Sequence, residues 1–184
     1  LSRTNPTLPT SCGLDVALIL DLSGSVGSQV TALRGAADTL VNALQGTPSR
    51  MSLFSFSTGT PADNASQNYP ALTSVATAAQ GTAFKARYST WTAGGGTNWD
   101  VGLAAVANAN DVPDMAIIIT DGNPTFYGNP AAGPGSFTRL REVENGIFSA
   151  NAICSDGTRM IALGVGSGVD DAATAQNLAA ISGP

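Results

Sequence analysis

Residues 16–25 read Val-Ala-Leu-Ile-Leu-Asp-Leu-Ser-Gly-Ser, and this stretch decides the fold class of the chain. The unbroken apolar run at its start predicts a central strand of a parallel sheet, which is buried on both faces. Asp21, Ser23 and Ser25 follow where the strand ends. In open α/β sheets, ligands bind just beyond the carboxyl ends of the strands. Because these three side chains offer only oxygen atoms, the stretch predicts a site for a hard cation such as Mg²⁺.

Apolar strands alternate with helical patterns along the rest of the chain. Together they predict a doubly wound α/β fold, in which a central, mostly parallel sheet has helices on both faces and one short antiparallel edge strand. The predicted strands span residues 15–22, 51–57, 71–75, 115–120 and 159–165, and the predicted helices span residues 26–44, 77–88, 100–110, 137–151 and 170–181. The helix faces expected to be buried include Ala79, Ala83, Phe84 and Tyr88, and Leu140, Val143 and Ile147.

Two later stretches complete the predicted site. A glycine run at residues 94–96 leads into Thr97, and a glycine loop before a helix lets the backbone approach a ligand closely. The apolar run 115–119 ends two residues before Asp121, which repeats the pattern of the first strand. Asp21 and Asp121 with three hydroxyls form an oxygen site of low charge. A bound cation would stay electrophilic there and would accept an acidic oxygen from a partner.

The composition excludes several classes of function. The 184 residues carry a net charge of −5 without a basic cluster to neutralise phosphates, so binding to nucleic acid or anionic lipid is not expected. No apolar run is long enough to span a membrane. The chain has no histidine, which is the commonest general base and zinc ligand. Only 11% of the residues are charged, which favours a secreted or cell-surface protein.

An enzyme is the less favoured alternative. Phosphoryl transfer at a Mg²⁺ site would need groups that the sequence lacks. A Walker loop is absent, and serine replaces the second acid of an Asp-x-Asp pair in Asp21-Leu22-Ser23. The single lysine, Lys85, is not near the motifs. We therefore expect a binding protein rather than an enzyme.

Two cysteines, Cys12 and Cys154, precede the first and last predicted strands, so both would lie at the amino-terminal edge of the sheet. They form either one disulfide or two buried free thiols. We favour the disulfide, which requires an oxidising compartment.

Four motifs together resemble the von Willebrand factor type A (vWA) domain with its metal-ion-dependent adhesion site (MIDAS). The resemblance runs from about residue 15 to residue 183. Its Gly-Gly-Thr-Asn-Trp form particularly resembles bacterial surface members, including pilus and adhesin tips. The motifs are Asp21-Leu22-Ser23-Gly24-Ser25, Gly95-Gly96-Thr97-Asn98-Trp99, Ile119-Thr120-Asp121-Gly122 and Ile161-Ala162-Leu163-Gly164-Val165-Gly166.

The resemblance implies a MIDAS cation, Mg²⁺ or Mn²⁺ with Ca²⁺ as an alternative. Ser23, Ser25 and Thr97 would hold it, with Asp21 and Asp121 binding directly or through water. It also implies an extracellular protein or glycan ligand whose acidic group completes the coordination shell. The predicted ligand contacts around the cation are Gly24, Gly96, Asn98, Gly122, Asn123 and Tyr127.

Aromatic side chains near the predicted rim either contact the ligand or pack inside the fold. Trp99 favours packing because it begins a helix, and the loop at residues 123–135 is the place where specificity is expected. The other aromatic residues near the rim are Trp91, Phe126 and Tyr127.

Residues 1–11 are predicted to form a leader or linker, and residues 12–184 a vWA domain without the last strand that is usual in the family. We expect the domain to belong to a larger surface protein. The alternative is an intracellular vWA subunit that assists the assembly of a chelatase or ATPase complex, which a disulfide would argue against.

Overall fold

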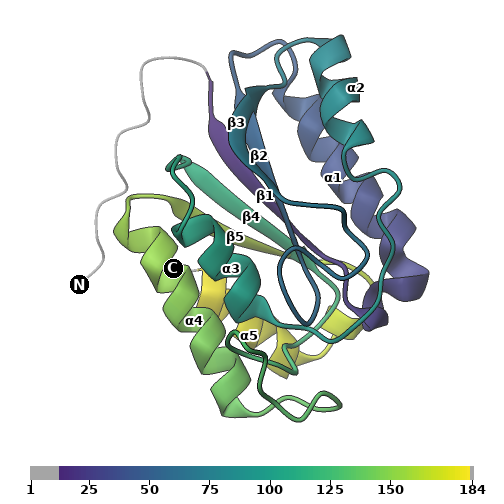
Figure 1. Ribbon diagram of the computed structural model, residues 1–184, viewed down its shortest axis with the longest axis vertical. Coiled ribbons are helices and arrows are strands. Elements are labelled where there is room, and N and C mark those ends of the chain that lie inside the picture. The colour runs from purple at the N-terminus through teal and green to yellow at the C-terminus, as the bar shows by residue number, and fades with distance from the viewer. Residues whose placement is uncertain (1–12, 183–184) are drawn as a thin grey trace.

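The computed structural model describes residues 13–182, and a five-stranded sheet lies at its centre (Figure 1). The strands are β1 (Asp15–Asp21), β2 (Arg50–Phe56), β3 (Tyr69–Ser74), β4 (Met115–Thr120) and β5 (Arg159–Gly164). Their spatial order is β3-β2-β1-β4-β5, and every neighbouring pair is parallel except β2 and β3. The predicted mostly parallel sheet with one antiparallel edge strand is therefore confirmed.

The central strand β1 is apolar and buried along almost its whole length. Alternate residues of β1 join two hydrophobic clusters, one on each face of the sheet. Leu20 pairs with Ile119 of β4, and Asp21 pairs with Phe56 of β2. The carboxyl ends of three strands therefore lie side by side, as the sequence predicts.

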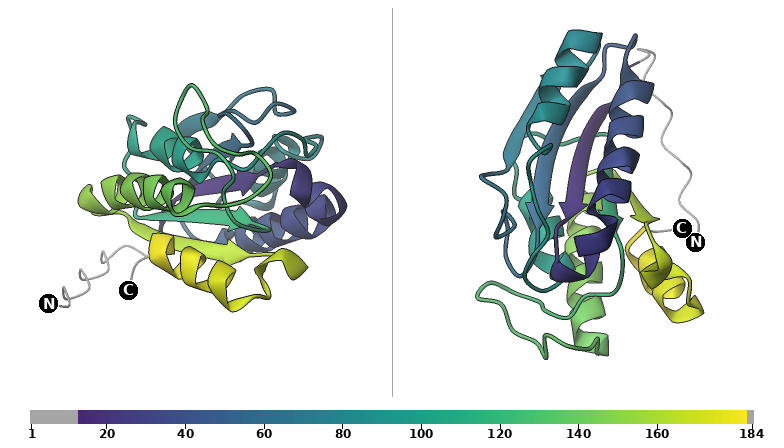
Figure 2. Two further views of the ribbon diagram at one scale, coloured as in Figure 1. Left: turned by 90° about the horizontal axis from the view of Figure 1, so that it is seen from below. Right: turned by 90° about the vertical axis from the view of Figure 1, so that its right-hand side faces the viewer.

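Helices cover both faces of this sheet, with α1 and α4 on opposite sides (Figure 2). They are α1 (Val30–Leu44), α2 (Ala78–Ala86), α3 (Trp99–Ala107), α4 (Leu140–Ser155) and α5 (Ala172–Ser182), with short 3₁₀ helices η1 (Gly24–Gln29) and η2 (Ser167–Val169). Helices α1 and α2 pack on one face, while α3, α4 and α5 contribute to the hydrophobic cluster on the other. Among the described helices, none is both long and apolar enough to cross a bilayer.

The predicted helix at residues 26–44 has two parts. Its first turns form the 3₁₀ helix η1, and the α-helix begins only at Val30. Glycine and serine dominate Gly24–Gln29, and both are weaker helix formers than alanine or leucine. This irregular segment directly follows Ser23, so it lies at the predicted site.

The predicted buried face of helix α2 is confirmed for Phe84 and Tyr88, which are both 2% exposed, and is wrong for the two alanines. Ala79 and Ala83 are exposed, whereas Gly81 and Phe84 are buried. A Cβ atom built on Gly81 would lie 2.5 Å from Nε2 of Gln45, so glycine allows the close approach of α2 to the end of α1. Gly81 and Phe84, and not the alanines, are thus the buried residues of α2.

The predicted buried face of α4 holds for Val143, and Ile147 is half-buried, but the prediction for Leu140 is wrong because its side chain is 79% exposed. The N-terminal turn of α4 extends beyond the carboxyl ends of the strands (Figure 1). Leu140 therefore lies outside the contact between α4 and the rest of the core.

The predicted leader and disulfide fall partly outside the described residues. Residues 1–11 and Cys12 are not among them. Cys154 lies near the end of α4 and is exposed, so it is not the buried thiol of the alternative prediction. The pairing of Cys12 with Cys154 stays a prediction.

Candidate metal-binding site

Asp21 is the last residue of β1 and is completely buried. Its carboxylate accepts hydrogen bonds from the backbone N–H of Ser23 at 2.8 Å and from the hydroxyl of Thr120 at 2.5 Å. Burial raises the pKa of the Asp21 carboxyl to about 7, although both hydrogen bonds favour the ionised form. A cation placed beside this group would favour the ionised form further, so the site is suited to one.

Ser23, Ser25 and Asp121 form a row of side-chain oxygens. Ser25 Oγ donates to Oδ1 of Asp121 at 2.9 Å, although the two residues are 96 positions apart in the chain. That bond uses the single hydroxyl hydrogen of Ser25, so Ser23 Oγ is the donor in its 3.0 Å contact with Ser25 Oγ. Burial also raises the pKa of the Asp121 carboxyl. The serine hydroxyls after β1 thus meet the aspartate after β4 in the fold, as the sequence predicts.

The backbone of Thr97 is held by hydrogen bonds, whereas its side-chain hydroxyl makes none within residues 13–182. The N–H of Thr97 donates to Oγ1 of Thr125 at 3.3 Å, and its carbonyl accepts from the N–H groups of Thr125 and Phe126 at 2.8 and 2.9 Å. Within residues 13–182, the Thr97 hydroxyl has no hydrogen-bond partner. A rigidly placed hydroxyl with free lone pairs is available to a cation or a ligand.

The glycine loop before Thr97 is shaped by close contacts. Gly95 has a φ of +80°, which favours glycine, and a Cβ atom there would lie 2.6 Å from Oδ2 of Asp63. A Cβ atom on Gly96 would lie 2.2 Å from the ring of Phe126. The glycines therefore let this loop pass between the loops that carry Asp63 and Phe126, and this places Thr97 at the site.

Ser25, Thr97 and Asp121 open into a cavity of about 530 Å³, which we call the site hollow. Asp121 is the one ionisable side chain among its lining residues. Hydroxyl groups and glycine backbone form most of the wall. The remaining lining residues are Ser28, Gln29, Gly95, Gly96, Gly122, Asn123, Thr125, Gly135, Ser136, Ser167 and Gly168.

The donor set fits a hard divalent cation. Carboxylate and hydroxyl oxygens are the kinds of ligand that Mg²⁺ and Ca²⁺ accept. Within residues 13–182, no three histidine, cysteine, aspartate or glutamate side chains are grouped to hold a metal. Serine and threonine hydroxyls would therefore have to complete the protein's share of the shell, and the uncommitted Thr97 hydroxyl is the clearest candidate.

The predicted ligand contacts are only partly brought together. Gly96, Gly122 and Asn123 line the site hollow. Gly24 is exposed next to it, and its N–H donates to the carbonyl of Gly95 at 2.8 Å. These four residues thus surround the predicted cation ligands.

Asn98 and Tyr127 lie elsewhere. Asn98 is fully buried and caps α3, and its amide donates to the carbonyls of Thr58 and Gly128 at 3.0 and 3.1 Å. Tyr127 lies on the loop after β4, where the guanidinium of Arg141 is 5.5 Å from its ring centre. The Asn98 side chain therefore braces the loops behind the site hollow and does not face it.

The aromatic residues near the rim pack mainly inside the fold. Trp91 and Trp99 are 3% and 0% exposed, so both serve packing. Phe126 and Tyr127 are half-buried, and Phe126 lies against Gly96.

Two hydroxyls that support the site were not predicted. Thr120 donates to Asp21, and Thr58 accepts from the N–H of Gly96 at 2.8 Å. Thr120 closes the apolar run of β4 and Thr58 lies two residues beyond β2, so both occur at carboxyl ends of strands. The sequence signal that both hydroxyls share is thus their position at the end of a strand. By contrast, the close approach of Gly168 in η2 to the carbonyl oxygen of Asp121 has no signal in the sequence.

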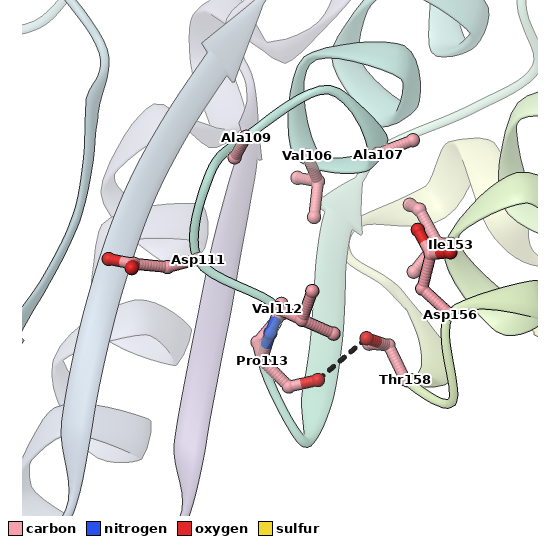
Figure 3. Close-up of a pocket in the computed structure, with 9 residues that line it drawn as sticks. All are labelled: Val106, Ala107, Ala109, Asp111, Val112, Pro113, Ile153, Asp156 and Thr158. Atoms are coloured by element: carbon pink, nitrogen blue, oxygen red, sulfur yellow. Dashed lines mark hydrogen bonds between the residues drawn. The ribbon is translucent and has the colours of Figure 1, made fainter.

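A second depression lies at the opposite, amino-terminal edge of the sheet (Figure 3). Its volume is about 10 Å³, which is roughly the space of one water molecule. Thr158 Oγ1 donates to the carbonyl of Pro113 across it at 2.6 Å. The site hollow is therefore the better candidate for ligand binding.

The sequence model of the von Willebrand factor type A domain matches residues 15–184, and the chain belongs to this family. Among curated protein sequences, none matches the chain.

Solved structures share the fold at low sequence identity. The pilus adhesin SpaC from Lactobacillus rhamnosus GG is 20% identical with a TM-score of 0.69, over 95% of this chain and 28% of that one. A D319A mutant of the PilB minor pilin from Streptococcus sanguinis is 14% identical with a TM-score of 0.69, over 97% and 56%. Manganese-loaded Plasmodium vivax TRAP protein is 20% identical with a TM-score of 0.54, over 85% and 59%. The chain thus spans less than two-thirds of each of these proteins.

Proposed function

We propose that this vWA domain is a binding module that holds a divalent cation and captures an acidic group through it. Asp21, Ser23, Ser25, Thr97 and Asp121 would hold the cation. The observation that carries the proposal is the row of oxygens from Ser23 to Asp121 beside the uncommitted Thr97 hydroxyl, at the wall of a hollow. Divalent cation binding is general in the vWA family, and the TRAP structure was obtained loaded with manganese.

The cation would supply a positive charge that the hollow itself lacks. Its shell would contain neutral hydroxyls and at most two carboxylates, so the cation would keep affinity for a further anionic oxygen. A carboxylate of a protein or glycan ligand is therefore the expected partner. Ser28, Gln29, Ser136 and Ser167 line the hollow and can donate to or accept from neutral groups around that carboxylate.

The residues that line the site hollow suit a binding site better than a catalytic one. Asp121 is the one ionisable residue among the lining residues, so the hollow offers no second group for proton transfer. The structural neighbours include a pilus adhesin and a minor pilin. We therefore place the domain in an extracellular or cell-surface protein, as part of a larger chain that contacts a protein or glycan.

The first test measures cation binding by the wild-type protein. Titration calorimetry and thermal unfolding with Mg²⁺, Mn²⁺ and Ca²⁺ should show binding and a higher Tm, because the cation binds the native state preferentially. At a concentration 100 times the Kd the gain is about 2.7 kcal/mol, or roughly 5–10 °C for a domain of this size. No heat of binding and no change in Tm with any of the three cations would refute the proposal.

The second test concerns the ligand. Immobilised extracellular matrix proteins and uronate-containing polysaccharides are probed with the domain in Mn²⁺ and in EDTA. Capture that disappears in EDTA is the expected result. Capture that is equal in both buffers would show that binding does not pass through a cation.

A further inference from the structure

The loop that carries Asp121 is tied to helix α5 by side-chain hydrogen bonds. Asn123 follows Asp121 by two residues. Its Nδ2 donates to Oγ1 of Thr174 at 2.6 Å, and its Oδ1 accepts from Nδ2 of Asn177 at 2.9 Å. Both ends of the Asn123 amide are thus bound to α5, although this residue lines the site hollow.

The contacts continue to the start of α5. Thr174 is 1% exposed, and its hydroxyl donates to the carboxylate of Asp171, which also accepts from the Thr174 N–H at 2.9 Å. The donors therefore run in one direction, from Asn177 through Asn123 and Thr174 to a carboxylate. Hydrogen bonds aligned in this way polarise and strengthen one another.

A backbone contact beside this network holds the same loop. The 3₁₀ helix η2 immediately precedes α5, and a Cβ atom built on Gly168 would lie 2.1 Å from the carbonyl oxygen of Asp121. The N–H of Val165 also donates to the carbonyl of Thr120 at 2.9 Å. The segment from β5 to α5 therefore touches the chain on both sides of the Asp121 carboxylate.

We propose that Thr174 and Asn177 are positioning residues for the cation site, and that Asn123 transmits the position of α5 to Asp121. This inference rests on the proposed function. Asp121 has to keep its carboxylate near Ser25 and Thr97, and Asn123 restrains the loop two residues further on. By linkage, the effect is reciprocal: a bound cation stabilises the docked position of α5 as much as docked α5 stabilises the cation.

The test compares two buried threonines. Thr174→Val removes the acceptor for Asn123 while keeping the side-chain volume. Thr158→Val is the matched control, because Thr158 is 4% exposed and its hydroxyl bonds to Pro113 at the opposite edge of the sheet (Figure 3). Mn²⁺ affinity is measured by calorimetry, and Tm is measured in EDTA.

We expect Thr174→Val to weaken Mn²⁺ binding about tenfold, while Thr174→Ser restores it and Thr158→Val leaves it unchanged. Both valine variants should lower the Tm in EDTA, since each loses a buried hydrogen bond. If Thr174 had only a structural role, Thr174→Val would lower the Tm and leave the Mn²⁺ affinity unchanged. Equal Mn²⁺ affinity of wild type and Thr174→Val therefore overturns the positioning role but leaves the proposed function intact, whereas a wild type that binds no cation overturns both.

Hydrogen exchange gives an independent readout and a milder variant. In the wild type, Mn²⁺ should slow amide exchange in residues 172–182, which supply no predicted cation ligand. Asn177→Ala, which removes one donor to Asn123, should reduce this protection and weaken Mn²⁺ binding several-fold. Exchange in α5 that is the same with and without Mn²⁺ in the wild type would contradict the coupling.

Discussion

The acidic side chains at the two edges of the sheet differ in their bonding partners. At the amino-terminal edge, Asp15 forms an ion pair with Arg50 at 2.5 Å, and Asp114 accepts from the backbone N–H of Asp15 at 2.9 Å. At the carboxyl edge, Asp21 and Asp121 have no ion-pair partner within residues 13–182, and their side-chain donors are hydroxyls.

The acids of the amino-terminal edge are bonded to groups of the protein, whereas Asp121 at the carboxyl edge lines the site hollow. The polar groups of the amino edge are satisfied by the protein itself, and the space left there is that of about one water molecule. The acids of the carboxyl edge are buried with raised pKa values, beside a hollow of about 530 Å³. A carboxylate buried without a counter-charge is costly unless a cation joins it.

Removing one acid from each edge should have the largest effect on the difference between the two edges. Asp121→Ala should abolish the Mn²⁺-dependent rise in Tm and any cation-dependent capture of ligand, because it removes one of the two predicted acidic ligands of the cation. Asp114→Ala at the other edge should leave both unchanged. Thermal unfolding of the two variants with Mn²⁺ and with EDTA measures this, and an Asp121→Ala protein that still responds to Mn²⁺ would refute the assignment.

The buried carboxylate of Asp21 makes the cation-free protein sensitive to pH. Its pKa is about 7 in the folded state against 3.8 for an ordinary aspartate, so between those values the folded protein holds the extra proton. Stability in EDTA should therefore fall as the pH rises from about 4 to 7, by an amount on the order of 4 kcal/mol.

Asp21→Asn tests the same group without titration. The amide can donate to Thr120 Oγ1, which can in turn donate to the carbonyl of Gly122. In EDTA at pH 8 the variant should be more stable than the wild type, and Mn²⁺ should reverse the order by stabilising the wild type alone. Tm measured from pH 5 to pH 8 checks both points, and a flat wild-type profile in EDTA would contradict the raised pKa.

A pair of glycine variants tests how tightly the loops behind the site are packed. Gly96→Ala would place a Cβ atom 2.2 Å from the Phe126 ring and should destabilise the protein by about 1–3 kcal/mol. Gly122→Ala meets no heavy atom within 4 Å and should change stability by less than about 0.5 kcal/mol. Denaturant unfolding measures both, and equal effects would show that Phe126 moves freely away from the glycine loop.

The smallest effect is expected at the ion pair of the amino edge. The side chain of Arg50 is 52% exposed, so Arg50→Ala should lower the stability only slightly, and by less at high salt. Cation affinity should not change. A larger loss of stability, or any loss of Mn²⁺ binding, would mean that the two edges are coupled through the sheet.

Much of the fold could be predicted because its signals are local. The apolar runs of β1 and β4 are too long and continuous for anything but buried elements, and an aspartate follows each run within two residues. Parallel strands joined by helices bring such ends to one edge. Asp21 and Asp121 could therefore be placed together although they lie 100 positions apart in the sequence. The predictions failed where burial depended on how a helix is placed against the sheet, as at Ala79 and Ala83 of α2 and at Leu140 of α4.

The side-chain partners at the site could not be predicted in the same way. Asn98 and Asn123 both flank glycine or aspartate motifs, and both were expected to contact the ligand. The fold buries the amide of Asn98 against Thr58 and Gly128 and ties the amide of Asn123 to α5. An amide bonds to whichever polar group the fold brings within reach, and those groups come from segments 30 to 54 residues away.

The strands, their shared edge and the oxygen-bearing residues there could thus be predicted from the sequence, because periodicity and residue chemistry are properties of short stretches. Three features follow from the folded arrangement alone: the Ser25 hydroxyl meets Asp121, the Thr97 hydroxyl has no hydrogen-bond partner within residues 13–182, and α5 bonds to the loop after Asp121. Each of these depends on the exact distance between elements that are remote in the chain. Hydrogen bonds need that distance to within a few tenths of an ångström, whereas the hydrophobic burial that builds the sheet is non-directional.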